Sequence, residues 1–104
     1  MTWDAAEAFC VDQGGHLVSI HLPEENNFII NNFNIQFGGA WIGLQLNSDV
    51  WKWTDGTEFD CDYWDKDEYP NAKKNKAKIV KTKWWQKDSP ITKMYFFCKK
   101  PAIP

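Results

Sequence analysis

An acidic cluster lies in the middle of the sequence, between residues 60 and 68. Its five carboxylates belong to Asp60, Asp62, Asp65, Asp67 and Glu68. Hard cations such as calcium take six to eight oxygen ligands, so carboxylates this close in sequence are suited to holding one. Without a cation, lysine or solvent between them, the same charges repel one another. The cluster is therefore either a cation site or a solvated loop balanced by the lysines that follow it.

A basic stretch comes after the acidic cluster. From residue 72 onward the chain has ten Lys against Asp88 alone, and residues 1–51 contain no Lys. Four of these residues are candidates for a patch that binds sulfated polysaccharide: Lys73, Lys74, Lys76 and Lys78. In a strand, Lys76 and Lys78 share one face while Lys81 and Lys83 share the other. The alternative is a set of solvated strand faces. The chain has no Arg, which excludes bidentate guanidinium recognition of phosphate, and we expect no nucleic-acid partner.

Two arrangements of these residues would support catalysis. Glu68 with Asp65 or Asp67 is a carboxylate pair of the kind used in glycoside hydrolysis, and Cys61 with a histidine is a candidate nucleophile. No motif sets the separation of the acids, and both histidines lie within the first 21 residues. No spacing of His and Cys predicts zinc. We therefore expect a non-catalytic protein, and a secreted hydrolase is the less favoured interpretation.

The composition is typical of one small globular domain spanning residues 1–104. Seven Trp, seven Phe and three Tyr supply enough large side chains for a core, which excludes disorder. No run approaches the roughly 20 apolar residues of a membrane span. Met1 is followed directly by a helix signal, so no leader is visible and we expect a mature or excised domain.

The first third of the chain predicts two helices. Thr2 is an N-cap for a helix beginning at Trp3, and Gly14-Gly15 stop it. Residues 16–20 have the pattern of a strand. Pro23 at a first helical position, with apolar residues at helical spacing up to Phe33, predicts the second helix.

The remainder of the chain predicts strands around one long loop. Residues 40–46 and 51–53 have strand patterns, and Thr54-Asp55-Gly56-Thr57 is a turn. Residues 58–75 have no sustained period, and a loop of that length is usually functional. Three short strands follow at residues 77–81, 83–86 and 93–98. Helices first and strands afterwards predict an α+β domain.

Several short motifs in this order resemble the C-type lectin-like domain. They are Trp3-Asp4-Ala5-Ala6-Glu7-Ala8-Phe9-Cys10, Leu17-Val18-Ser19-Ile20, Glu24-Glu25-Asn26-Asn27-Phe28, Trp41-Ile42-Gly43-Leu44, Trp51-Lys52-Trp53-Thr54-Asp55-Gly56 and Phe96-Phe97-Cys98. The resemblance implies two helices flanking short twisted antiparallel sheets, with a long ligand-binding loop. It also implies a short strand before the first helix; none precedes Met1 here, so we expect a frayed or exposed sheet edge. An extracellular recognition module, secreted or on an ectodomain, is the implied function.

The resemblance also assigns the cysteines. It pairs Cys10 with Cys98, a bridge that closes a loop long enough to stabilise the fold by roughly 4–5 kcal/mol. A second family bridge would need cysteines near Ala77 and Pro90, where this chain has none. Cys61 is left over, as a free or buried thiol, half of an intermolecular disulfide, or an introduced residue.

In sugar-binding members of the family, Glu-Pro-Asn in the long loop and Trp-Asn-Asp on a later strand bind one calcium ion. This chain has Glu68 and Asn71 with Tyr69 inserted before the proline, and Trp85, Gln86 and Lys87 at the second triplet. An ammonium in place of a carboxylate repels the ion, although a one-residue shift would offer Asp88. We therefore expect a degenerate site to which calcium binds weakly or not at all, with calcium-dependent sugar binding as the alternative.

The predicted ligand site combines both triplets. Its residues are Glu68, Tyr69, Asn71, Trp85, Gln86 and Lys87, and Glu68, Asn71 and Asp88 are the metal ligands if calcium binds. Three tryptophans of the family motifs quoted above, Trp41, Trp51 and Trp53, are expected to be structural. Trp64, Trp84 and Trp85 lie at or beside the loop, and each is either core or ligand contact.

Overall fold

A computed structural model describes residues 1–33, 35, 38–65 and 74–100. Helix α1 (Trp3–Asp12) begins where Thr2 Oγ1 accepts a hydrogen bond from the Ala5 amide. Helix α2 (Pro23–Asn32) begins with proline, and Glu25 Oε1 accepts from the His21 and Leu22 amides just before it. Both predicted helices are confirmed, because each has a local capping signal.

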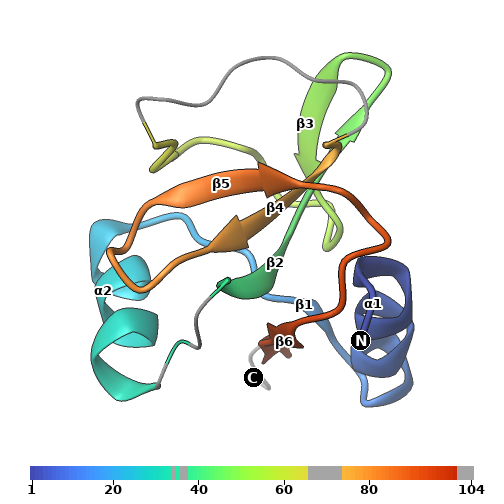
Figure 1. Cartoon of the computed structure of the whole chain (residues 1–104), viewed down its shortest axis with the longest axis horizontal. Coiled ribbons are helices and arrows are strands. Elements are labelled where there is room, and N and C mark those ends of the chain that lie inside the picture. The colour runs from blue at the N-terminus through green and yellow to red at the C-terminus, as the bar shows by residue number, and fades with distance from the viewer. Residues whose placement is uncertain (34, 36–37, 66–73, 101–104) are drawn as a thin grey trace.

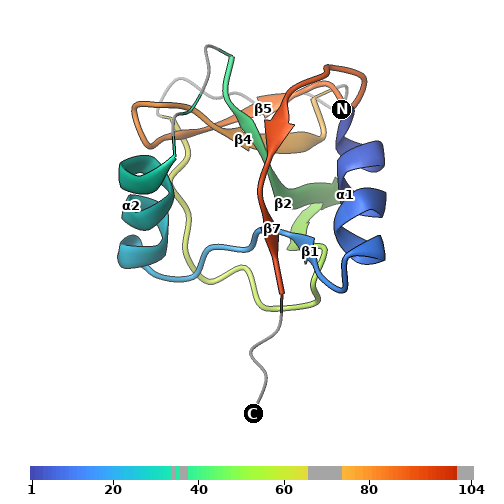
Figure 2. The same ribbon diagram turned by 90° about the horizontal axis from the view of Figure 1, so that it is seen from below.

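The strands form two sheets. They are β1 (His16–Leu17), β2 (Ala40–Asn47), β3 (Val50–Trp53), β4 (Lys76–Ile79), β5 (Trp85–Asp88), β6 (Tyr95–Phe96) and β7 (Cys98–Lys99). The larger sheet has the order β3-β2-β4-β5, and β6 pairs in parallel with β2; the smaller sheet is β1-β7 (Figure 1). Figure 2 shows the two helices on opposite sides of the domain, with β1 and β7 side by side between them. The predicted α+β class is confirmed.

Four predicted strands have bounds that differ in the structure by two residues or more. The one expected at residues 77–81 is β4, which ends at Ile79. The strand expected at residues 16–20 is limited to β1, and the one expected at 93–98 is two strands, β6 and β7, in different sheets. The strand expected at 83–86 begins at Trp85 instead, because Lys83 has a φ of 78°, which no strand accommodates. Ile79 therefore pairs with Trp85, and Lys76 pairs with Asp88.

The core consists of two clusters that share strand β2. One cluster lies between β2, β4, β5 and α2 and includes Ile42, Leu44 and Trp85; the other joins α1 to Trp41. The indole nitrogen of Trp3 donates to the Ile42 carbonyl at 2.9 Å, which ties α1 to the sheet. Trp41 and Trp53 are buried, so their predicted structural role is confirmed.

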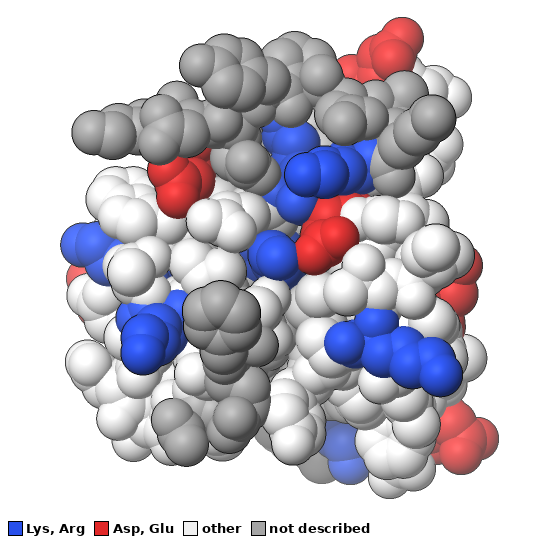
Figure 3. All heavy atoms as spheres, in the orientation of Figure 1, with Lys and Arg blue, Asp and Glu red and all other residues white. Residues whose placement is uncertain are grey.

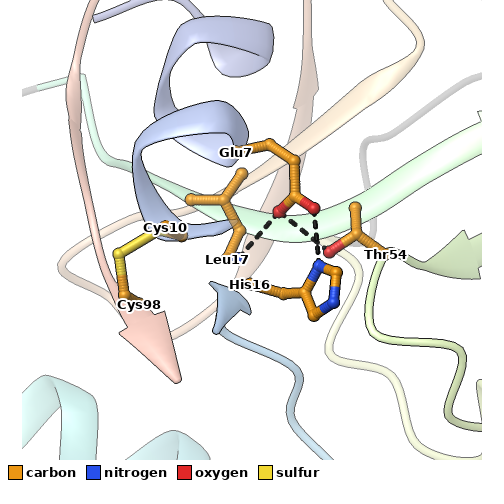
Figure 4. Close-up of a disulfide and its surroundings, with 6 residues drawn as sticks. All are labelled: Glu7, Cys10, His16, Leu17, Thr54 and Cys98. Carbon is orange, nitrogen blue, oxygen red and sulfur yellow. Dashed lines mark hydrogen bonds and ion pairs between the residues drawn. A yellow bond between two sulfur atoms is a disulfide. The ribbon is translucent and has the colours of Figure 1, made fainter. Parts of the chain in front are cut away.

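Glu7 and a disulfide hold α1 against the smaller sheet (Figure 4). The Glu7 carboxylate accepts from the Leu17 amide at 2.9 Å and from Thr54 Oγ1 at 3.1 Å, and it lies 2.7 Å from His16 Nδ1. Cys10 and Cys98 are joined, with an S–S distance of 2.05 Å, so the predicted pairing is confirmed. His16 therefore has a structural role.

In the described parts of the chain, β7 has β1 as its strand partner, and no second strand pairs with it. None of the helices in the described residues is long and apolar enough to cross a bilayer.

Candidate binding site

Trp85, expected at the ligand site, belongs to the core. Its side chain is fully buried, and its indole nitrogen donates to Asn26 Oδ1 on α2 at 2.9 Å. Its amide donates to the Tyr63 carbonyl at 2.7 Å. The predicted ligand contact is therefore wrong for Trp85, because α2 and the 54–65 segment cover the strand at this point. Trp84, one residue earlier, is 41% exposed.

Gln86 and Lys87 lie on β5 and hold the near end of the long loop. Gln86 Nε2 donates to Asp65 Oδ2 at 3.2 Å, and Lys87 Nζ lies 5.4 Å from the centre of the Trp64 ring. Trp64 in turn packs on Trp51, with ring centres 5.0 Å apart. These contacts position the beginning of the loop on the sheet, and an ammonium stands at the position where the family pattern has a carboxylate.

Asp88, the alternative metal ligand, is engaged within the protein. Its Oδ2 lies 2.8 Å from Lys78 Nζ, and its Oδ1 accepts from the Ser89 amide at 2.7 Å and from Thr92 Oγ1 at 3.0 Å. Burial alone would raise the pKa of the Asp88 carboxyl, but the bonds from Lys78, Ser89 and Thr92 outweigh burial and lower it. A calcium ion at Asp88 would have to displace the Lys78 ammonium.

Replacing Asp88 by asparagine is expected to lower the free energy of unfolding at neutral pH by about 1–2 kcal/mol, because a charged hydrogen-bond acceptor is lost. The pKa of Asp88 is lowered in the folded state, so its contribution is present above about pH 4 and is lost as pH falls through the lowered folded value. Urea unfolding from pH 7 to pH 2 measures the difference. The control is Asp62→Asn, which changes an exposed acid. If the difference between Asp88→Asn and the parent stayed constant across that pH range, the ionised Asp88 carboxylate would not be its source.

The other residues of the predicted ligand site, Glu68, Tyr69 and Asn71, lie outside the described residues, as does Lys73 of the predicted polyanion patch. Within the described residues no group of three or more His, Cys, Asp or Glu is arranged to hold a metal. Two of the described acids of the cluster have separate partners: Asp60 lies 2.9 Å from His21 Nδ1, and Asp65 accepts from Gln86.

The predicted polyanion patch is interrupted at two of its lysines. Lys76 is 9% exposed; its Nζ lies 4.0 Å from the centre of the Trp3 ring and 3.1 Å from Gln45 Oε1. Burial lowers the pKa of Lys76, and Asp4 opposes that shift. Lys78 is paired with Asp88. The expectation that both lysines are free to bind a polyanion is therefore wrong; of the described members, Lys74 is exposed.

Sequence reasoning missed a polar centre around Lys99. The Lys99 ammonium lies 3.1 Å from the Ser19 carbonyl, 3.2 Å from Ser19 Oγ and 3.1 Å from Glu25 Oε2. Ser19 Oγ also donates to Asp55. The network joins β7, α2 and the turn after β3, and no local motif marks it because its members are far apart in sequence. A cavity of about 660 Å³ lies beside it, lined largely by Phe28, Phe33, Phe96 and Phe97.

Cys61 is a half-buried free thiol between two carboxylates. Burial raises its pKa, and the charges of Asp60, Asp62 and Glu25 raise it further. A nucleophilic cysteine needs the opposite environment, one that favours the thiolate. The geometry therefore provides no support for a Cys61 nucleophile.

The chain belongs to the C-type lectin domain family, whose pattern, described as "Lectin C-type domain", matches residues 1–100. Members of this family are in general non-enzymatic binding modules.

Two curated relatives illustrate the range of the family. The "Type-2 ice-structuring protein" of Brachyopsis segaliensis is 48% identical over 66 residues, which cover 62% of this chain and 38% of that protein. "Snaclec botrocetin subunit beta" of Bothrops jararaca is 42% identical over 95 residues, which cover 82% of this chain and 71% of that protein. The chain thus spans well under half of the first relative.

Two solved structures have the same fold over nearly the whole chain. The carbohydrate-recognition domain of cow CD23, solved in the presence of GlcNAc2Man3 oligosaccharide, matches with a TM-score of 0.89 and 27% identity, covering 100% of this chain and 83% of that one. A calcium-independent type II antifreeze protein matches with a TM-score of 0.87 and 35% identity, covering 99% and 81%. The predicted C-type lectin-like fold is confirmed.

Proposed function

We propose that this chain is a non-catalytic extracellular recognition module that binds a glycan or protein ligand through its long loop, without calcium at the degenerate site. The observation that carries the proposal is the Lys78–Asp88 ion pair beside Lys87. The Lys87 ammonium stands where the family's sugar binders have a calcium-binding carboxylate, and Asp88, the next residue on β5, is already paired with Lys78. Glu68, Tyr69, Asn71, Gln86 and Lys87 remain the proposed ligand contacts.

The Cys10–Cys98 disulfide supports an extracellular location, because such bonds persist in oxidising compartments. The match to a calcium-independent antifreeze protein supports metal-free function within this fold. C-type lectin-like domains bind glycans or proteins, so the proposal includes both classes of ligand.

Calcium is expected to leave the thermal stability unchanged. A ligand that binds only the native state raises stability by RT ln(1 + [L]/Kd), so a weak or absent site gives equal melting temperatures in millimolar calcium and in chelator. Immobilised mannose and galactose should retain no protein in a chelator-reversible way. A melting temperature that falls on chelation, together with calcium-dependent retention that Asn71→Ala abolishes, would establish the alternative, a calcium-dependent lectin.

Ice is a second candidate ligand. The observation that favours it is the similarity to an ice-structuring protein and to a calcium-independent antifreeze protein, the second aligned over 99% of this chain. Thermal hysteresis of a concentrated solution measures this activity directly. A freezing point depressed below the melting point, unaffected by chelator, would support ice binding, and coincident freezing and melting would exclude it.

A further inference from the structure

The turn between β4 and β5 presents four consecutive exposed residues, Lys81, Thr82, Lys83 and Trp84. The turn is closed by hydrogen bonds from the Val80 amide to the Trp84 carbonyl at 3.0 Å and from the Lys83 amide to the Val80 carbonyl at 2.9 Å. Figure 1 shows it beside α2, at the end of the hairpin away from Asp88. Figure 3 shows Lys side chains at this edge, apart from the interleaved Lys and acidic side chains near the middle of the same face. We call residues 81–84 with Tyr63 the hairpin tip.

Lys83 is held in a backbone conformation that lysine rarely adopts. Its φ of 78° lies in the left-handed region, which costs a side chain other than Gly, Asn or Asp about 1–2 kcal/mol. Asn26 of α2 imposes this conformation: it is fully buried, and its Nδ2 donates to the Lys83 carbonyl at 3.0 Å while its Oδ1 accepts from Trp85. Strain of this kind persists only where surrounding structure overrides it, and it is common at functional sites.

The constrained backbone places an ammonium group over an exposed aromatic ring. Lys83 Nζ lies 5.5 Å from the centre of the Trp84 ring, and Trp84 is 41% exposed. The Tyr63 ring lies beside Trp84, with centres 6.2 Å apart and planes tilted by 49°. Lys81 adds a second exposed ammonium at the same turn. An acid acts on the Tyr63 side, where the charge of Glu24 helps to raise the pKa of Tyr63, after burial and Cys61. A bound anion is therefore expected on the lysine side.

We propose that the hairpin tip binds a sulfated saccharide, an inference that rests on the proposed role of the chain as a recognition module. A sulfated pyranose presents a flat C–H surface that packs on Trp84 and a fixed anion that pairs with Lys81 and Lys83. Free sulfate engages the lysines alone, and a neutral sugar engages the ring alone. The hairpin tip replaces the interrupted patch at residues 73–78 as the polyanion site. Its lysines and Trp84 lie outside the long loop, which contributes only the neighbouring Tyr63 ring.

The test is titration of a fluorescent heparin-derived hexasaccharide at low and at physiological salt, with the neutral maltohexaose as comparison. Trp84→Ala is expected to weaken binding about fivefold to tenfold. The double variant Lys81→Gln/Lys83→Gln is expected to weaken it about tenfold at low salt and to flatten its salt dependence, because screening acts on those ammonium groups. The matched control is Lys52→Gln/Lys93→Gln, which removes the same charge from two other exposed lysines. It should bind like the parent.

Equal weakening by the two double variants would overturn the site and show attraction to overall charge only. Parent-like binding by Trp84→Ala, equal affinity for maltohexaose, or no binding at low salt would also overturn it. Thermal melts confirm that each variant is folded. If the hairpin-tip variants bind the hexasaccharide like the parent, the hairpin-tip site is wrong. The proposed function still holds in that case, provided that the protein binds a glycan or protein ligand and Asn71→Ala abolishes that binding. If no ligand binds in any assay, the proposed function fails as well.

Discussion

Loss of the Cys10–Cys98 disulfide is expected to lower the free energy of unfolding by about 4–5 kcal/mol. The two cysteines are 88 residues apart in sequence, so the bridge restricts nearly the whole unfolded chain, and the chain-entropy model gives that magnitude. Domains of this size are stable by about 5–15 kcal/mol, so the unbridged protein should be close to unfolding at body temperature. Urea unfolding of Cys10→Ala/Cys98→Ala measures the loss.

The experiment requires Cys61→Ser in both the bridged and unbridged proteins, because a free thiol exchanges with disulfides. Cys61→Ser alone is the control for that change and should alter the free energy of unfolding by less than about 1 kcal/mol, as Cys61 is half-exposed. A loss below about 1 kcal/mol in the unbridged variant would show that the Glu7 contacts and the core hold α1 in place without the bridge.

The second large effect is expected at Asn26. Asn26→Ala should lower the free energy of unfolding by about 2–4 kcal/mol, because it leaves the buried Trp85 indole N–H and the Lys83 carbonyl without partners. The left-handed Lys83 also loses the contact that holds it. Urea unfolding gives the stability change, and the hexasaccharide titration gives the accompanying loss at the hairpin tip.

A double-mutant cycle separates the hydrogen bond from the packing. Trp85→Phe removes the indole donor, so Asn26→Ala should cost about 1–2 kcal/mol less in that background than in the parent. Asn27→Ala, at the exposed neighbour on the same helix, should change the free energy of unfolding by less than about 0.5 kcal/mol. Additive effects of Asn26→Ala and Trp85→Phe would contradict the proposed coupling.

The amino-acid sequence by itself predicted the elements whose signals are local. Thr2 and Pro23 mark the beginnings of both helices, and the run from Ala40 predicts β2. The family resemblance carried the fold and the Cys10–Cys98 pairing, because several ordered motifs span almost the whole chain. Both were confirmed.

The tertiary structure decided which polar and aromatic side chains remain accessible. The hairpin register pairs Lys76 with Asp88 and brings Lys78 within bonding distance of that acid. Two lysines that the sequence alone does not distinguish from exposed ones are therefore removed from the surface. Trp84 and Trp85 are adjacent and chemically identical, yet one is exposed and the other is bonded to Asn26 in the core. Lys83 and Lys99 take their positions from residues 57 and 80 places away in the chain. Exposure and ion pairing depend on such long-range contacts, and no local pattern in the sequence encodes them.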